Sequence, residues 1–229
     1  MKSLLQYTAS KLVLIALAAS VIVGCSTTKQ QEQSTQLKAD KAGLTAVEQT
    51  HLDGTFIAAG AHLAKYKKLI VEQLDMSNVR VRKQPPSNTY EEAPWQLNDD
   101  DRRYYQERYT EALMNNLIAD GTYTTAVQAG TDVLTVSAKV VEIAHLGSKD
   151  ATKGVAKNEL NSEGMGTMTL EISLYDSVSG KPQAIITDQR DLGRLFEINN
   201  RASNNIQARV AFNYWLLSLR KTLDKASGR

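Results

Sequence analysis

A single cysteine, Cys25, limits how this chain of 229 residues can be stabilised. A disulfide needs two cysteines, so no bridge within the chain can brace the fold. With 42% hydrophobic and 23% charged residues, a chain of this length can still bury a sizeable core by packing alone. We therefore expect one globular domain, and the composition excludes collagen-like, coiled-coil and wholly disordered classes.

The first 24 residues have the pattern of an export signal. Lys2 and Lys11 are the only charged side chains there, and an apolar run over residues 12–23 follows them. This run is well short of the roughly 20 apolar residues that a permanent membrane-spanning helix needs. We therefore predict that residues 1–24 are a signal peptide, removed on export.

The four residues Ile22-Val23-Gly24-Cys25 resemble the lipobox of bacterial lipoproteins. The resemblance implies that the Cys25 thiol takes a diacylglyceryl group, that cleavage falls between Gly24 and Cys25, and that the freed amine is then acylated. Several acyl chains anchor a protein firmly, at about 0.8 kcal/mol for each buried methylene. Because Ser26 follows the cysteine instead of an aspartate, the resemblance also implies the outer membrane, with the domain facing the periplasm. The alternative is an ordinary secretory signal that happens to end at a cysteine.

Charge argues against a nucleic-acid partner. Removal of residues 1–24 takes two lysines from the 27 Lys+Arg, which leaves 25 basic against 25 acidic side chains. A mature chain near neutrality has no excess of positive charge with which to release counterions from nucleic acid or anionic lipid. The membrane partner is therefore expected through the covalent lipid at Cys25.

Residues 25–49 are mostly polar, with Leu37, Leu44 and Val47 as their only large apolar side chains. This composition predicts a flexible tether behind the acylated N-terminus, with a root-mean-square span of roughly 25 to 30 Å. A short helix over residues 36–50, at the edge of the domain, is the alternative. The globular domain is then expected over residues 50–229.

Within that domain, apolar residues recur with the periods of strands and of two long helices. The predicted order is a strand near residues 69–74, a helix from about 98 to 121, strands at 123–128, 133–146, 167–174 and 182–188, and a helix at 203–225. Residues 82–98 hold three of the four prolines and are expected to form a loop. Strands grouped in succession predict an α+β two-layer sandwich, with a largely antiparallel sheet of about five strands and two main helices.

Several local signals are specific. Apolar and polar residues alternate over residues 167–174, which predicts a half-buried strand, and the turn that ends at Gly180 predicts a hairpin. A slip in the alternation near Val141 indicates a β-bulge. Ser203 is the expected cap of the last helix. The apolar stripe of that helix consists of Ala208, Phe212, Trp215, Leu216, Leu219 and Leu223.

Five short segments carry a resemblance to a known family. They are Tyr66-Lys67-Lys68-Leu69-Ile70-Val71, Arg108-Tyr109 with Ala112-Leu113, Asp132-Val133-Leu134, Leu174-Tyr175-Asp176-Ser177 with Gly180, and Asp188 with Arg190. Together they resemble the bacterial lipoproteins grouped as domain-of-unknown-function family 3313, over roughly residues 50–225. The resemblance implies an exported lipoprotein with an α/β domain, and it brings no catalytic residues.

The histidines and serines give no metal or hydrolase motif. His51, His62 and His145 are isolated in sequence, and Cys25 is assigned to lipid, so a zinc site is not expected. His145 could act as a ligand or base, but a solvent-facing residue at a strand end is the favoured interpretation. No Gly-x-Ser-x-Gly elbow occurs in the sequence.

Carboxylates on the predicted hairpin offer the main catalytic alternative. Asp176, Asp188 and Asp191 could work as paired acids, as in glycan hydrolases. We favour a structural role, in which Asp176 accepts hydrogen bonds from the amides of its turn and Asp188 pairs with Arg190 or Arg194 at the surface.

Three further patterns have ordinary structural explanations. Lys149, Lys153 and Lys157 recur every four residues in a glycine-containing loop, where a solvated series is favoured over contact with an anionic glycan or partner. Tyr104, Tyr105 and Tyr109 suggest a carbohydrate platform, but two of them share the core stripe of their helix, so core packing is favoured. The Gly164-Met165-Gly166 segment lacks the rest of a nucleotide-binding fingerprint and is expected to open a strand.

We therefore expect a non-catalytic, lipid-anchored envelope lipoprotein that needs no cofactor and acts as a binding or assembly accessory factor. Its expected partner is another envelope component, either a protein or a glycan. Two alternatives stay open. One is an envelope glycan hydrolase with paired carboxylates, and the other is a carrier of a small ligand in a cavity between sheet and helices.

Overall fold

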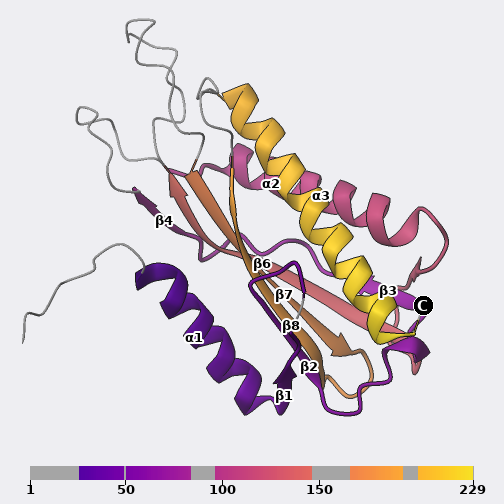
Figure 1. Ribbon diagram of the computed structural model, residues 1–229. Coiled ribbons are helices and arrows are strands. Elements are labelled where there is room, and N and C mark those ends of the chain that lie inside the picture. Colours follow the sequence, from indigo (N-terminus) through magenta and orange to yellow (C-terminus); the bar gives the residue numbers. More distant parts are fainter. Residues whose placement is uncertain (1–25, 49, 84–95, 146–165, 193–200, 229) are drawn as a thin grey trace, which may run out of the picture.

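The computed structural model describes residues 26–48, 50–83, 96–145, 166–192 and 201–228 (Figure 1). Within these residues, three α-helices and one sheet form the fold. The elements are α1 (Ser26–Lys41), β1 (Leu44–Ala46), β2 (Gly54–Ala58), η1 (Leu63–Lys65), β3 (Lys68–Val71), β4 (Arg80–Lys83), α2 (Asp99–Leu113), η2 (Met114–Ile118), β5 (Thr124–Thr125), β6 (Val133–His145), β7 (Gly166–Asp176), β8 (Pro182–Asp191) and α3 (Arg201–Ala226).

The sheet is mixed, which corrects the prediction of about five largely antiparallel strands. In the described residues it has eight strands in the order β1-β2-β8-β7-β6-β3-β5, with β4 paired to β6 off this path. The pairs from β1 to β6 along this order are antiparallel, whereas β3 pairs in parallel with both β5 and β6, and β4 in parallel with β6. The parallel pairs arise because α2 forms a crossover between β3 and β6, which returns the chain in the same direction.

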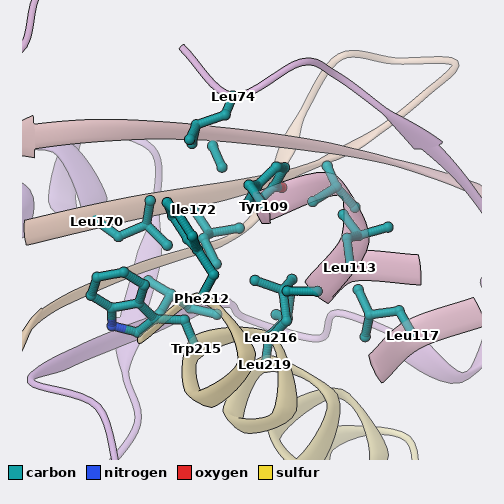
Figure 2. Close-up of a cluster of buried hydrophobic side chains, with 14 of the residues drawn as sticks. Leu74, Tyr109, Leu113, Leu117, Leu170, Ile172, Phe212, Trp215, Leu216 and Leu219 are labelled. Atoms are coloured by element: carbon teal, nitrogen blue, oxygen red, sulfur yellow. The ribbon is translucent and has the colours of Figure 1, made fainter. Parts of the chain in front are cut away.

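One face of the sheet carries the main core, under α2 and α3. The whole predicted stripe of α3 is buried there, together with the apolar residues of β6 and β7. Figure 2 shows Phe212 and Trp215 of α3 beside Leu170 and Ile172 of β7, with Tyr109 of α2 close by. The stripe therefore determines which side of α3 packs on the sheet.

Several local predictions are confirmed. The helix expected from about residue 98 begins there, and Asn98 caps it through a capping box with Asp101. The register between β6 and β7 shifts between Val140 and Glu142, at the predicted bulge. The hairpin of β7 and β8 is also present. Two boundaries differ: the strand expected over 123–128 is reduced to β5, and α3 begins at Arg201 instead of after Ser203. Of the loop expected over residues 82–98, residues 84–95 lie outside the described part.

The structure differs from the flexible tether predicted for residues 25–49. Residues 26–41 form α1, and β1 and β2 follow as two strands that the sequence pattern did not reveal. Glutamine, glutamate, lysine and alanine are good helix formers. Thr35 and Ala39, four residues apart on α1, are both buried against the second face of the sheet. That face is therefore covered as well, and α1 lies on the opposite side from α2 and α3 (Figure 1). The prediction of two layers with two main helices is corrected accordingly: helices cover both faces of the sheet, and α1 is the third helix of the described residues.

None of the helices in the described residues combines the length and the apolar character that crossing a bilayer requires.

Candidate functional site

A cleft of about 550 Å³ opens between the C-terminal half of α3 and residues 47–57. This volume lies within the range of about 300 to 1,000 Å³ that is usual for small-ligand sites. The described residues that line it are Val47, Thr50, His51, Ile57, Ser218, Lys221, Thr222, Lys225 and Ala226. The cleft therefore lies where the predicted tether, which includes Val47, meets the predicted domain, which includes Thr50, His51 and Ile57.

One wall of the cleft is a single face of α3. Ser218, Lys221, Thr222 and Lys225 follow one another at spacings of three, one and three residues, which places them on one side of the helix. The buried Leu219 and Leu223 on the neighbouring side hold the helix on the sheet. The cleft wall is therefore the polar flank of a helix whose position the core sets.

The other wall is anchored to α3 and β8 by hydrogen bonds. The Tyr214 hydroxyl donates to the His51 carbonyl oxygen at 3.1 Å. The backbone N–H of Asp53 donates to Asp188 Oδ1 at 2.9 Å, and the backbone N–H of Gln189 donates to Asp53 Oδ2 at 2.8 Å. This reciprocal pair fixes the chain just before β2, so the lining residues Thr50 and His51 have little freedom to move away from α3.

Asp188 is the buried centre of this anchor, with a side chain only 4% exposed. Trp215 Nε1 donates to its Oδ2 at 2.7 Å, and Arg190 Nη1 lies 3.6 Å from the same oxygen. Burial raises the pKa of Asp188 above its ordinary value, although the hydrogen bonds from Trp215 and from the Asp53 amide act in the opposite direction. The Arg190 guanidinium also stacks on the Tyr214 ring, 3.4 Å from its centroid.

The predicted carboxylate pair is not brought together. Asp188 faces Leu170 across the β7–β8 ladder, and Asp176 lies six residues further along β7, a separation of about 20 Å. Paired acids of glycan hydrolases lie within roughly 10 Å of each other. Asp191 is exposed at the far end of β8. The three aspartates therefore do not form the acid pair that the hydrolase alternative needs.

Asp176 has the turn role that the sequence predicted. Its Oδ1 accepts hydrogen bonds from the backbone N–H groups of Val178 and Ser179, and its Oδ2 accepts from the Tyr66 hydroxyl and from Lys65 Nζ. The Ser179 amide, followed by the Tyr66 hydroxyl, holds the pKa of Asp176 well below its ordinary value. The predicted ion pair between Asp188 and Arg190 is present at 3.6 Å, but its predicted place at the surface is wrong, because the carboxylate is buried against Trp215.

The histidines are not gathered into a metal site. His51 lines the cleft, His62 precedes η1 and His145 ends β6. Among the described residues, no three His, Cys, Asp or Glu side chains are placed to hold a metal ion.

The tyrosines and glycines behave as the structural interpretations predicted. Tyr105 and Tyr109 are buried in the main core, and the Tyr104 hydroxyl donates to the Asn205 carbonyl oxygen. Gly166 opens β7 with a positive φ of 108°. The predictions on Gly24, Cys25, Lys149, Lys153, Lys157 and Arg194 concern residues outside the described part of the chain.

The chain matches the model of a family described as proteins of unknown function, DUF3313, over residues 32–219. It belongs to this family. No curated protein matches this DUF3313 chain. The match begins within α1, so residues 32–49 of the predicted tether lie inside the family domain.

Solved structures resemble this DUF3313 chain only distantly. The PelC dodecamer from Paraburkholderia phytofirmans is 12% identical with a TM-score of 0.39, and the similarity covers 72% of this chain and 96% of that one. Protein XCC0632 from Xanthomonas campestris, of family DUF330, is 11% identical with a TM-score of 0.38, covering 71% and 86%. A PDZ domain protein from Parabacteroides distasonis is 10% identical with a TM-score of 0.40, covering 83% and 40%.

Proposed function

We propose that this DUF3313 protein is a non-catalytic, lipid-anchored envelope lipoprotein that binds another envelope component in the cleft between α3 and residues 47–57. The cleft is the observation that carries the proposal, because it is concave, has apolar walls at Val47 and Ile57, and has one wall held in place by the Asp53–Asp188 hydrogen bonds. A wall that is already ordered loses little entropy when a partner binds.

The membrane anchor is part of the same proposal. The lipobox pattern at Ile22-Val23-Gly24-Cys25 supports acylation of Cys25, and α1 begins at the next residue. A helix of 16 residues is about 24 Å long, and α1 packs on the sheet through Thr35 and Ala39. An acylated Cys25 therefore keeps the domain within about one helix length of the lipid headgroups, in our proposal at the periplasmic side of the outer membrane.

The hydrolase alternative has less support than binding. Its two main candidates, Asp176 and Asp188, lie at opposite ends of the hairpin, and each is engaged by neighbouring donors. A carrier of a small ligand remains compatible with the cleft, and it differs from an assembly factor only in what occupies the site.

The test compares three variants of the full chain in cells. Cys25→Ser should abolish labelling by radioactive palmitate and release the protein from the membrane fraction. Thr222→Trp fills the cleft with an indole, whereas Val178→Trp adds the same group on the exposed hairpin turn, where Val178 is 62% exposed. Molecules that co-purify with the wild-type protein should be retained by Val178→Trp and lost from Thr222→Trp. Unchanged membrane attachment of Cys25→Ser, or identical co-purified molecules in both tryptophan variants, would contradict the proposal.

A further inference from the structure

We infer that the cleft binds the acyl chain of a single-chain anionic amphiphile of the fatty-acid class, with the carboxylate held at the rim by Lys221 and Lys225. This inference rests on the proposed function and specifies the chemistry of the bound component. Three observations lead to it: most of the lining surface is apolar, the rim is positively charged, and the volume suits one chain.

The interior of the cleft has little to offer a polar ligand. The Thr50 hydroxyl donates to the Leu52 carbonyl oxygen at 3.1 Å, and the Thr222 hydroxyl donates to the Ser218 carbonyl oxygen at 2.9 Å. Both of these hydroxyl protons are used inside the protein. Besides the Ser218 hydroxyl and the His51 imidazole, the uncharged part of the described lining comes from Val47, Ile57, Ala226 and aliphatic carbon. Ile57 also packs against the main core, so the apolar floor of the cleft continues into it. Such a surface favours hydrocarbon over sugar hydroxyls.

The rim carries positive charge that the cleft itself does not neutralise. Lys221 and Lys225 are both exposed, one helical turn apart, and none of the described lining residues is acidic. The neighbouring flank of α3 is different: Arg220 forms ion pairs with Asp120 and Asp224 at 2.8 Å each. Two ammonium groups at the mouth of an apolar cleft complement a carboxylate whose chain lies inside.

The size and stiffness of the cleft favour a single chain over a larger partner. A concave site of about 550 Å³ has the size of a small-molecule pocket, whereas a standard protein interface is a broad surface patch of about 800 Å² per partner. The wall at Thr50 and His51 is pinned through Tyr214 and Asp53, so the cleft has its shape before a ligand arrives.

The experiment uses the full chain with Cys25→Ser, so that its own acyl chains do not compete, in isothermal titration calorimetry below the micelle concentration of each probe. The probes are dodecanoate, dodecanol and dodecylamine, which share a chain and differ in head-group charge. We expect dodecanoate to bind tighter than dodecanol, and dodecylamine to bind most weakly. The double variant Lys221→Gln/Lys225→Gln should weaken dodecanoate by roughly 3-fold to 30-fold, leave dodecanol unchanged, and remove most of the salt dependence.

Two further variants distinguish binding in the cleft from general attraction of the anion to surface lysines and from binding elsewhere on the protein. Lys41→Gln/Lys67→Gln removes two exposed lysines that do not line the cleft, and it should leave the affinity for dodecanoate unchanged. Thr222→Trp should abolish binding of every probe, with its circular dichroism spectrum reporting that it still folds.

Each other outcome overturns the inference in a distinguishable way. Equal affinity for dodecanoate and dodecanol, unaffected by the lysine substitutions, would show a neutral apolar site and leave the proposed function standing. Binding that persists in a folded Thr222→Trp would place the amphiphile elsewhere. If no probe binds at all, the fatty-acid class is wrong, and the proposed function is then judged by its own co-purification test.

Discussion

The two faces of the sheet are buried by different means. Under α2 and α3 the sheet presents Met168, Leu170, Ile172 and Leu174 of β7, and they join one large apolar core. On the other face the same strand presents Thr167, Thr169, Glu171 and Ser173, which are equally buried. The strand predicted to be half-buried over residues 167–174 is therefore buried on both faces. Alternation of apolar and polar residues does not by itself mean that the polar side of a strand is open to solvent.

The polar face has only a small apolar cluster of its own. In the described residues that cluster consists of Ala39 of α1, Leu44 of β1, Phe56 of β2 and Ile185 of β8. Beside it, Glu171 is 4% exposed and forms ion pairs with both Lys38 of α1 and Lys139 of β6. A buried carboxylate of this kind adds little net stability, but it favours one placement of the helix over others. We infer that the main face supplies most of the folding free energy and that the α1 face supplies the position of α1.

The largest effect should come from the main face. Phe212 is fully buried and makes edge-to-face contacts with Tyr105, Tyr109 and Trp215. Phe212→Ala is expected to lower the free energy of unfolding by about 3 to 5 kcal/mol, because the rings around it cannot all close the cavity. Urea denaturation measures the loss. Leu217→Ala, at a position 44% exposed on the same helix, is the control and should change the free energy by no more than about 0.5 kcal/mol. A similar loss in both variants would mean that burial of Phe212 in the core does not account for the effect, because alanine is the better helix former at both positions.

A smaller and more local effect is expected on the α1 face. Ala39→Glu places a charge against Leu44, Phe56 and Ile185, and α1 can escape it by leaving the sheet. We expect a loss of about 1 to 2 kcal/mol in the free energy of unfolding. Amide hydrogen exchange should then show α1 unprotected while α3 keeps its protection, as for a unit that opens separately.

The control for α1 is the same substitution on its other side. Leu37 is 61% exposed, so Leu37→Glu should leave the protection of α1 unchanged. If Ala39→Glu instead lowers the protection of α3 as much as that of α1, the two faces unfold as one unit and the comparison between them fails.

The same contrast explains how much of the fold the sequence predicts. The main face was predictable, because the α3 stripe and the β7 alternation are long and regular, and the capping pair Asn98 and Asp101 marks the start of α2. The α1 face was not, because only Thr35 and Ala39 are buried among the α1 side chains that the structure describes (residues 33–41), and β1 and β2 are short. Parallel pairing was missed because β3 and β6 pair directly although the chain between them includes β4, α2 and β5, and no local pattern marks a partner so far along the sequence.

The candidate site was missed for the same reason. Its α3 wall lies on the polar flank of a predicted helix, where Lys221 and Lys225 are typical of the solvent-facing side and give no sign of a cleft. Its other wall lies in residues 47–57, which join the predicted tether to the domain. The run Thr55-Phe56-Ile57-Ala58 was the available signal of a strand there. The anchor between Asp53 and Asp188 joins positions 135 residues apart, and no local pattern reveals such a contact.

The smallest expected effect concerns the ion pair between Lys38 and Glu171. Burial by itself lowers the pKa of Lys38. The hydrogen bond and the charge of Glu171 together raise it by more than burial lowers it, so the pKa lies above the ordinary value of 10.5. A lysine whose pKa is raised in the folded state contributes stability below its unfolded pKa and loses it as the pH rises through the folded value.

Lys38 is 46% exposed and Lys139 still pairs with Glu171, so Lys38→Met should cost less than about 1 kcal/mol at pH 7 to 9. The difference in urea stability between wild type and Lys38→Met should then shrink above pH 10.5, and it should be absent at every pH in a Glu171→Gln background. Methionine keeps the aliphatic stem, so a difference that persists in that background would mean that the Lys38 ammonium acts through a group other than Glu171, and the ion pair would then contribute nothing to the position of the helix.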